Sequence, residues 1–192
     1  MKGLSKVLRG LHMNENDLKK YADHALRWGA TSVKEIDPSS VVTAAWVRLK
    51  CEFGCGGYNY SYCCPPHTPT TEETRRILDG YNRAFLFHIE TLSLQDKGKR
   101  LRKFLQMLVD LEGDMFKDGY YKAFVYLAGP CHLCKECGKV KGTGCNRGDR
   151  ARPSMEGCGI DVFQTARNND CHIKTLREET EPRNTFCLML VD

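Results

Sequence analysis

The strongest chemical signal in the sequence is a run of closely spaced cysteines. Cys131, Cys134 and Cys137 follow one another at intervals of three residues, and Cys145 lies eight residues farther on. Three thiolates at this spacing can all turn inward from one loop onto a cubane, while the fourth ligand comes from a more distant position. The pattern therefore predicts that these four cysteines hold a 4Fe-4S cluster.

Zinc is the main chemical competitor, because four thiolates also form a closed tetrahedral zinc site. Structural zinc usually takes its ligands as two separated pairs, and the crowding of three cysteines in one run favours iron–sulfur instead. The proline that ends a bacterial ferredoxin run is missing, since Asn146 follows Cys145. His132 in this loop and His67 upstream are expected to lie near metal without binding it.

A second group of cysteines lies upstream, and Cys51, Cys55 and Cys64 are its expected ligands. Two glycines after Cys55 and two prolines after Cys64 suit a tight, stiff loop around a bound ion. Three alternatives remain for the fourth position: Cys63, Cys158 or an open coordination site. Cys63 is adjacent to Cys64, and neighbouring side chains of an extended chain point in opposite directions. An open position would allow a substrate to reach the metal.

The chain has 192 residues, eleven of them cysteine, and its size and composition suit one globular domain over residues 1–192. No run approaches the roughly 18 apolar residues of a membrane span, and the basic N-terminus has no apolar signal region, so we expect a cytoplasmic protein. Disulfides are rare in that compartment, and clustered thiols there more often bind metal. The isolated Cys171 and Cys187 are expected to be ordinary thiols.

The formal net charge of +5 is a weak sign of an acidic partner. Two 4Fe-4S sites with eight thiolates would add roughly 4 negative charges and nearly cancel it. Basic side chains surround the second cysteine group, where we expect them to balance thiolate charge: Lys135, Lys139, Lys141, Arg147, Arg150 and Arg152. No aromatic residues alternate with them, so nucleic acid is not the expected partner. No glycine-rich phosphate or dinucleotide motif is present either.

Hydrophobic periodicity and capping signals predict the elements that position these cysteines. Helices are expected from an Asn16 cap to about residue 28, from a Thr70–Glu73 capping box, over 95–116 and over 161–167; strands are expected at 41–50, 84–89, 123–127 and 185–191. The alternation favours a mixed α/β (α+β) fold, with a central sheet flanked by helices and two cysteine-rich loops. If the strands at 41–50 and 123–127 are parallel, both cysteine groups lie at one sheet edge.

Four segments, 46–51, 64–66, 129–137 and 152–162, resemble the DUF2284 family of predicted metal-binding proteins, which is common in anaerobic bacteria and archaea. The similarity runs from about residue 21 to the C-terminus and implies metal binding without an assigned reaction. It supports the seven ligands at positions 51, 55, 64, 131, 134, 137 and 145. Cys63 and Cys171 fall outside the pattern that the resemblance implies.

These observations lead to one main hypothesis: a cytoplasmic iron–sulfur protein that holds two clusters and transfers electrons to or from a partner enzyme. The first alternative is a zinc-stabilised module that contacts RNA or protein through its basic loop. The second alternative is an enzyme that acts at a three-cysteine cluster with an open iron site.

Overall fold

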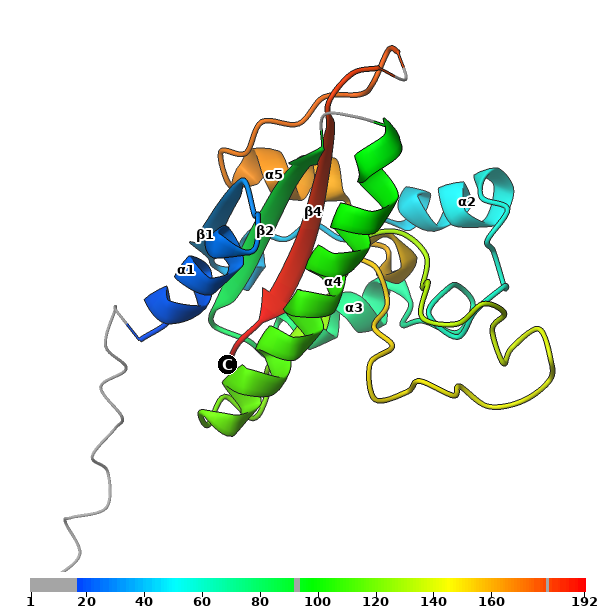
Figure 1. Ribbon diagram of the computed structural model, residues 1–192, viewed down its shortest axis with the longest axis horizontal. Helices are drawn as coiled ribbons and strands as arrows, with labels where there is room; N and C mark the ends of the chain where they lie inside the picture. Colours follow the sequence, from blue (N-terminus) through cyan, green and yellow to red (C-terminus); the bar gives the residue numbers. More distant parts are fainter. Residues whose placement is uncertain (1–16, 92–93, 179) are drawn as a thin grey trace, which may run out of the picture.

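The computed structural model describes residues 17–91, 94–178 and 180–192. Its centre is a four-stranded sheet in the order β1-β2-β4-β3 (Figure 1). The strands are β1 (Ser32–Ile36), β2 (Ala84–Thr91), β3 (Phe124–Tyr126) and β4 (Arg183–Leu190). All three strand pairs are antiparallel. The mixed α/β class is therefore as predicted.

Helices cover both faces of this sheet (Figure 1). They are α1 (Lys19–Arg27), α2 (Ala45–Gly54), α3 (Thr71–Leu78), α4 (Leu94–Lys117) and α5 (Val162–Asn168), with short 3-10 turns η1 (Pro38–Ser40) and η2 (Glu156–Cys158). α1 and α4 pack on one face, and α3, α5 and η2 pack on the other. α2 lies at the side of the sheet and packs against η2.

Strand β2 shows why the sheet is the core of the molecule. Phe85 and Phe87 face α1 and α4, while Ala84 and Leu86 face the opposite helices. Each of these side chains is at most 2% exposed. An unbroken apolar run is typical of a strand that is buried on both faces, and this prediction for 84–89 is confirmed.

Several local predictions are also confirmed. The Thr70 hydroxyl accepts from the Glu73 backbone N–H while the Glu73 carboxylate accepts from the Thr70 N–H, which forms the predicted capping box of α3. On that helix Leu78 is fully buried, but Ile77 is 36% exposed. The predicted helices over 95–116 and 161–167 correspond to α4 and α5. The Asn16 cap lies outside the described residues.

The prediction of a strand at 41–50 is wrong. Its β-branched residues, Val41 to Thr43, form the extended approach to α2, and the helix itself starts at Ala45. Most of the residues after Thr43 are good helix formers, which explains the helix. Because α2 buries only Val47, its hydrophobic residues show no clear helical period in the sequence. Cys51 therefore lies inside a helix. The premise of two parallel strands that end at cysteines fails, because the sheet is antiparallel.

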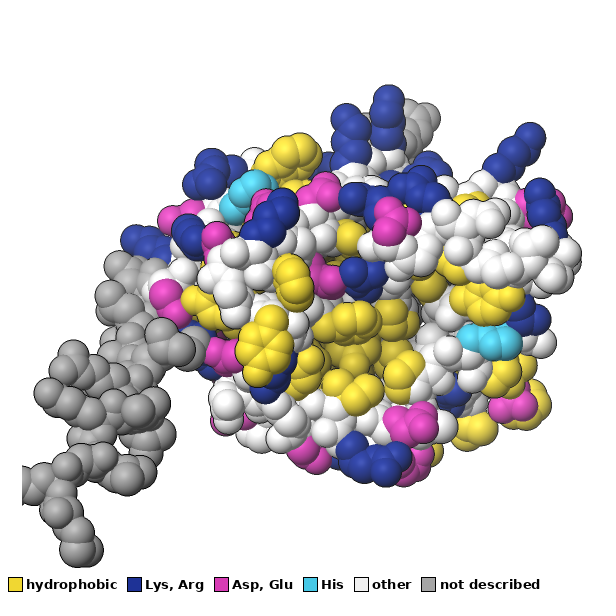
Figure 2. Space-filling view, turned by 90° about the horizontal axis from the view of Figure 1, so that it is seen from below, with side chains coloured by type: hydrophobic (Ala, Val, Ile, Leu, Met, Phe, Trp, Pro, Cys, Tyr) yellow, Lys and Arg dark blue, Asp and Glu magenta, His cyan; other side chains and the backbone are white. Residues whose placement is uncertain are grey.

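Strand β1 was not predicted, because only Ile36 at its end is fully buried and the rest of this edge strand is polar or half-exposed. No helix in the described part of the chain is both long and apolar enough to cross a membrane. Figure 2 shows the molecule from below, where hydrophobic side chains fill a recess near the centre of the face and charged side chains lie around it.

Candidate metal centre

The two cysteine-bearing loops lie side by side at one end of the molecule, as Figure 1 shows. One runs from Cys55 to Thr68 and the other from Gly129 to Arg152. The Tyr62 hydroxyl joins them by donating to the Thr143 carbonyl at 2.7 Å. Segments that are far apart in sequence thus meet through loop contacts and not through a shared sheet edge.

A hydrogen-bond network fixes the base of the first loop. Arg48, on α2, donates to the Gly157 carbonyl at 2.6 Å and to the Thr68 hydroxyl at 2.8 Å. The Thr68 hydroxyl in turn donates to the same Gly157 carbonyl. Because Gly157 belongs to η2, this network holds α2, the end of the first loop and η2 in one arrangement.

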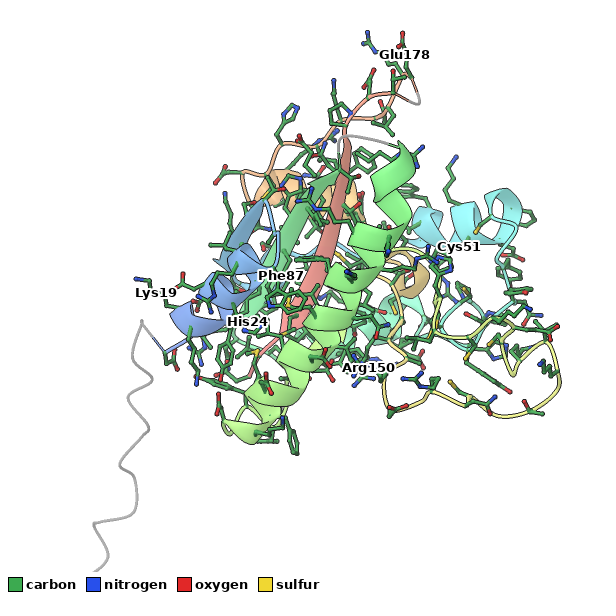
Figure 3. The ribbon with its side chains drawn as sticks, in the orientation of Figure 1. Lys19, His24, Cys51, Phe87, Arg150 and Glu178 are labelled. Atoms are coloured by element: carbon green, nitrogen blue, oxygen red, sulfur yellow. The ribbon has the colours of Figure 1, made fainter. Side chains whose placement is uncertain are left out.

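Cys51, Cys55 and Cys64 share the space above this network. Cys51 lies in the last turn of α2, on the side toward the two loops (Figure 3), and its thiol is 3.9 Å from the Glu156 carbonyl oxygen. Burial and the nearby Cys55 thiol raise the pKa of Cys51, and Cys64 adds a smaller contribution. The Cys64 sulfur accepts from the Ser61 hydroxyl at 3.2 Å. The three expected ligands of the first site thus lie near enough to interact electrostatically, but they are not placed to hold one metal ion.

Cys158 lies beside this first group. It belongs to η2, its side chain is 0% exposed, and it interacts electrostatically with Cys51. Burial raises the pKa of the Cys158 thiol to about 12. The residue is thus close to the first site, although its thiol is less ready to ionise than an exposed one.

Cys63 turns toward the second group instead. Its thiol shares a hydrogen bond with Cys131, which raises the pKa of Cys63 and lowers that of Cys131. The Leu133 backbone N–H also donates to the Cys131 sulfur, and Cys145 lies near enough to act on Cys63 electrostatically. The two consecutive cysteines lie in a turn, in which the Cys64 N–H donates to the Ser61 carbonyl at 3.1 Å, and they reach toward different groups.

The remaining expected ligands lie along the second loop, where Cys134 and Cys137 are half-buried and Cys145 is exposed. The Thr143 backbone N–H closes the loop by donating to the Gly138 carbonyl at 2.8 Å. A Cβ atom at Gly138 would overlap the Gly144 carbonyl oxygen. Only glycine fits this close approach, a requirement that sequence reasoning missed although the residue directly follows the cysteine run.

The donor set suits a thiophilic metal, since cysteine thiolates select zinc, copper(I) and iron–sulfur clusters. Among the described residues, however, no three His, Cys, Asp or Glu side chains are already placed to hold one metal ion. Metal binding and local folding are commonly coupled, so the thiols would draw together as the metal binds. The residue types fit a metal–thiolate site.

Sequence reasoning also missed Glu156. The backbone N–H of Gly129 and the Ser154 side chain form hydrogen bonds with its carboxylate, while its Oε2 atom is buried and has no hydrogen-bond partner. Burial raises the pKa of Glu156, and its charge raises the pKa of both Cys51 and Cys158. A single glutamate forms no spacing pattern in the sequence. The only sequence signal for a role at the site was its position two residues before Cys158.

Most of the basic residues near the second loop are paired with carboxylates. The pairs are Lys141–Glu136 at 3.1 Å, Arg147–Asp149 at 3.8 Å, Arg150–Asp110 at 2.8 Å and Arg152–Glu112 at 2.6 Å. Figure 3 shows Arg150 beside α4, where the loop returns to the body of the molecule. Arg150 and Arg152 thus attach the loop to α4, whereas the sequence had suggested that these cations balance thiolate charge.

The side chains that were expected to be outside the sites have other surroundings. His67 forms a 3.0 Å hydrogen bond with the Asn59 side chain, and His132 is exposed. Cys187 is fully buried in β4, and the Cys171 thiol lies 3.5 Å from the Asn169 carbonyl oxygen. All eleven cysteines are free.

Comparison with known proteins gives one match. A family model described as "Predicted metal-binding protein (DUF2284)" matches residues 34–191, which include every cysteine and exclude α1. No curated protein and no solved structure matches the chain. Since the match covers most of the sequence, the chain belongs to the DUF2284 family of predicted metal-binding proteins.

Proposed function

We propose that the protein holds two neighbouring iron–sulfur clusters, each of the 4Fe-4S type, and transfers electrons to or from a partner enzyme. The observation that carries the proposal is that the two cysteine-bearing loops lie side by side and are joined by the 2.7 Å hydrogen bond from the Tyr62 hydroxyl to the Thr143 carbonyl. Two thiol groups joined in this way would place their metals close together. Iron–sulfur clusters supply one-electron transfer, which depends on such short separations.

The first site would take Cys51, Cys55 and Cys64, with Cys158 as its fourth ligand. Cys158 is preferred over Cys63 because it lies beside Cys51, while Cys63 is engaged with the second group. The second site would take Cys131, Cys134, Cys137 and Cys145. There the Cys63 thiol would donate a hydrogen bond to the Cys131 sulfur, and hydrogen bonds to ligand sulfurs help to set cluster potentials.

A cytoplasmic location suits this proposal. Reducing thiol pools keep disulfides rare in the cytoplasm, so thiols there remain free for metal. A partner enzyme is part of the proposal because the described residues around the thiols include no side-chain arrangement for independent chemistry at the second loop.

Anaerobic purification followed by iron, sulfide and zinc analysis tests the proposal. We expect about eight iron atoms and eight sulfides per chain, with visible charge-transfer absorbance and reversible reduction. Cys134→Ser should remove about half of the iron. Cys171→Ser is the matched control and should retain all of it. Zinc without sulfide or visible absorbance would refute iron–sulfur and favour the zinc-stabilised binding module.

One observation favours a second candidate, an enzyme that acts at an open first site. Burial raises the pKa of Cys158, which opposes formation of the thiolate that a fourth ligand needs. A Cys158→Ser variant separates the two ideas. If Cys158 is a ligand, the first cluster should be lost or altered in its EPR spectrum, whereas an unchanged spectrum would indicate a three-cysteine cluster.

A further inference from the structure

A groove of about 590 Å³ opens beside the first thiol group. It lies between α2, α5, the start of β4 and the N-terminal half of α4, in the upper part of the molecule as drawn in Figure 1. Apolar side chains from these four elements and from the segment between α5 and β4 form most of its walls: Trp46, Leu101, Phe163, Ile173 and Phe186. Small-molecule sites typically have volumes of about 300–1,000 Å³ and mainly apolar walls.

Two candidate ligands of the first site and a carboxylate belong to the lining of this groove. Cys51, Cys55 and Glu156 all line it. The Glu156 Oε2 atom is buried and has no hydrogen-bond partner among the described residues. Leaving a buried carboxylate oxygen unpaired is unfavourable, so a ligand that donates an N–H or O–H group here would satisfy it.

The groove also presents positive charge. Lys50 and Arg183 line it with exposed side chains, and no described carboxylate forms an ion pair with either of them. The third cation, Lys174, is paired with Glu181 at 3.5 Å. The one other acidic residue in the lining, Asp161, caps α5 by accepting from the Gln164 backbone N–H. Lys50 and Arg183 are thus cations of the groove without an ion-pair partner among the described residues, and they can meet an anionic group from solvent.

We propose that this groove binds an aromatic organic anion that carries an N–H or O–H donor. The aromatic body would pack against Trp46 and Phe163, the donor would meet Glu156, and the anionic group would meet Lys50 and Arg183. The bound molecule would lie against Cys51 and Cys55. The proposal goes beyond electron transfer and does not depend on it, because the residues that contact the ligand are present with or without metal.

A matched pair of fluorescent probes tests the proposal on the full-length, anaerobically purified protein. Anilinonaphthalene sulfonate has two aromatic parts, an N–H donor and an anionic group, and phenylnaphthylamine is the same molecule without its sulfonate. We expect both probes to bind, the sulfonate more tightly by about tenfold, as for roughly one charge-assisted contact. Failure of the sulfonate to bind, or equal affinities for the two probes, would overturn the proposed preference for an anion.

Two exposed aromatic residues of α2 locate the bound probe. Trp46 lines the groove and is 48% exposed, whereas Phe53 lies outside the lining and is 79% exposed. Trp46→Ala should weaken binding of both probes about fivefold or more, since it removes one aromatic wall, and Phe53→Ala should leave binding unchanged. Equal losses in the two variants would show non-specific adsorption and overturn the site.

Two further variants test the polar contacts. The double variant Lys50→Gln with Arg183→Gln should weaken the sulfonate about tenfold and leave phenylnaphthylamine unchanged. Glu156→Ala should weaken phenylnaphthylamine, which carries the N–H but no charge, because the carboxylate that accepts from the ligand N–H is removed. Unchanged binding in either variant would show that the substituted residues do not contact the probe. Iron content, measured on the same samples, reports separately on the cluster proposal.

Discussion

The sheet beneath α4 and the two cysteine loops differ in how they are held. Phe87, Phe104 and Leu108 are at most 1% exposed and belong to one continuous apolar core. The second loop is instead held by isolated polar contacts, such as Tyr62 with Thr143 and Arg150 with Asp110. A packed core is stable without any ligand, whereas loops with few buried apolar contacts open locally at low cost. We therefore expect the first region to fold alone and the second to depend on metal.

Phe87→Ala should have the largest effect on this comparison. The side chain is fully buried between β2 and α4, and its removal should lower the free energy of unfolding by about 4 kcal/mol. The loss should be the same in the metal-free and the metal-loaded protein, as measured by urea denaturation. Phe116→Ala, at a 61% exposed site on α4, is the control and should change little. A loss in Phe87→Ala that disappears on metal loading would contradict the independence of the core.

Glu112→Ala should have the next largest effect, because Glu112 joins the two regions. It accepts from the Val125 backbone N–H at 2.8 Å and from Arg152 at 2.6 Å, and it is 7% exposed. Removal of one partner of such a buried pair should cost about 3 kcal/mol. Asp110→Ala, two residues earlier, breaks the exposed pair with Arg150 and should cost about 1 kcal/mol or less. Equal decreases in the free energy of unfolding of the two variants would contradict a stronger contribution of the buried Glu112 pair.

Gly138→Ala should separate loop closure from core stability. The new Cβ would collide with the Gly144 carbonyl, so the second loop should fail to close around metal. We expect iron content to fall while the free energy of unfolding of the metal-free chain changes by about 0.5 kcal/mol or less. Gly148→Ala is the control, because nothing lies within contact distance of a Cβ there. Full iron content in Gly138→Ala would show that this close approach is dispensable.

The smallest expected effect concerns pH and the packing of α1 on α4. Lys20 and Tyr21 donate to the Asp118 carboxylate at 2.6 and 2.7 Å, and these hydrogen bonds lower the pKa of Asp118. A carboxyl group with a lowered pKa contributes stability above its unfolded pKa of about 4, and this contribution is lost as the pH falls through the folded value. Asp118→Asn should therefore flatten the acid limb of stability below about pH 4 and leave metal content unchanged. An identical acid limb in thermal unfolding would contradict the assigned contacts.

The parts of the fold that could be predicted from sequence are those where one local rule dominates. Three elements are specified by their own residues alone. These are β2 by its apolar run, α4 by apolar residues at helical spacing over many turns, and α3 by its capping box. The segment around Val41 was predicted to be a strand because it is rich in β-branched residues. These residues in fact precede a helix that is mostly exposed and therefore shows no clear apolar period. Strand β1 has too little burial to give a pattern at all.

The candidate site divides in the same way. The short spacings of the cysteines predicted the two groups, whereas the turn that contains Cys63 and Cys64 was not predicted. Glu156 and the close approach at Gly138 depend on contacts between distant segments, and such contacts leave no local pattern. The groove is also assembled from four elements and could not be read from any one of them.

The Cys63–Cys64 pair has a thermodynamic consequence. Cα atoms of consecutive residues are fixed at about 3.8 Å, so a displacement of one of these cysteines is transmitted to the other. If a metal draws Cys64 toward Cys51, it also repositions Cys63 against Cys131, and the free energy of loading one site then depends on the occupancy of the other. Such coupling is reciprocal. Loading of one site would therefore change the metal affinity of the other by the same factor in both directions, and the peptide bond between residues 63 and 64 is the link between them.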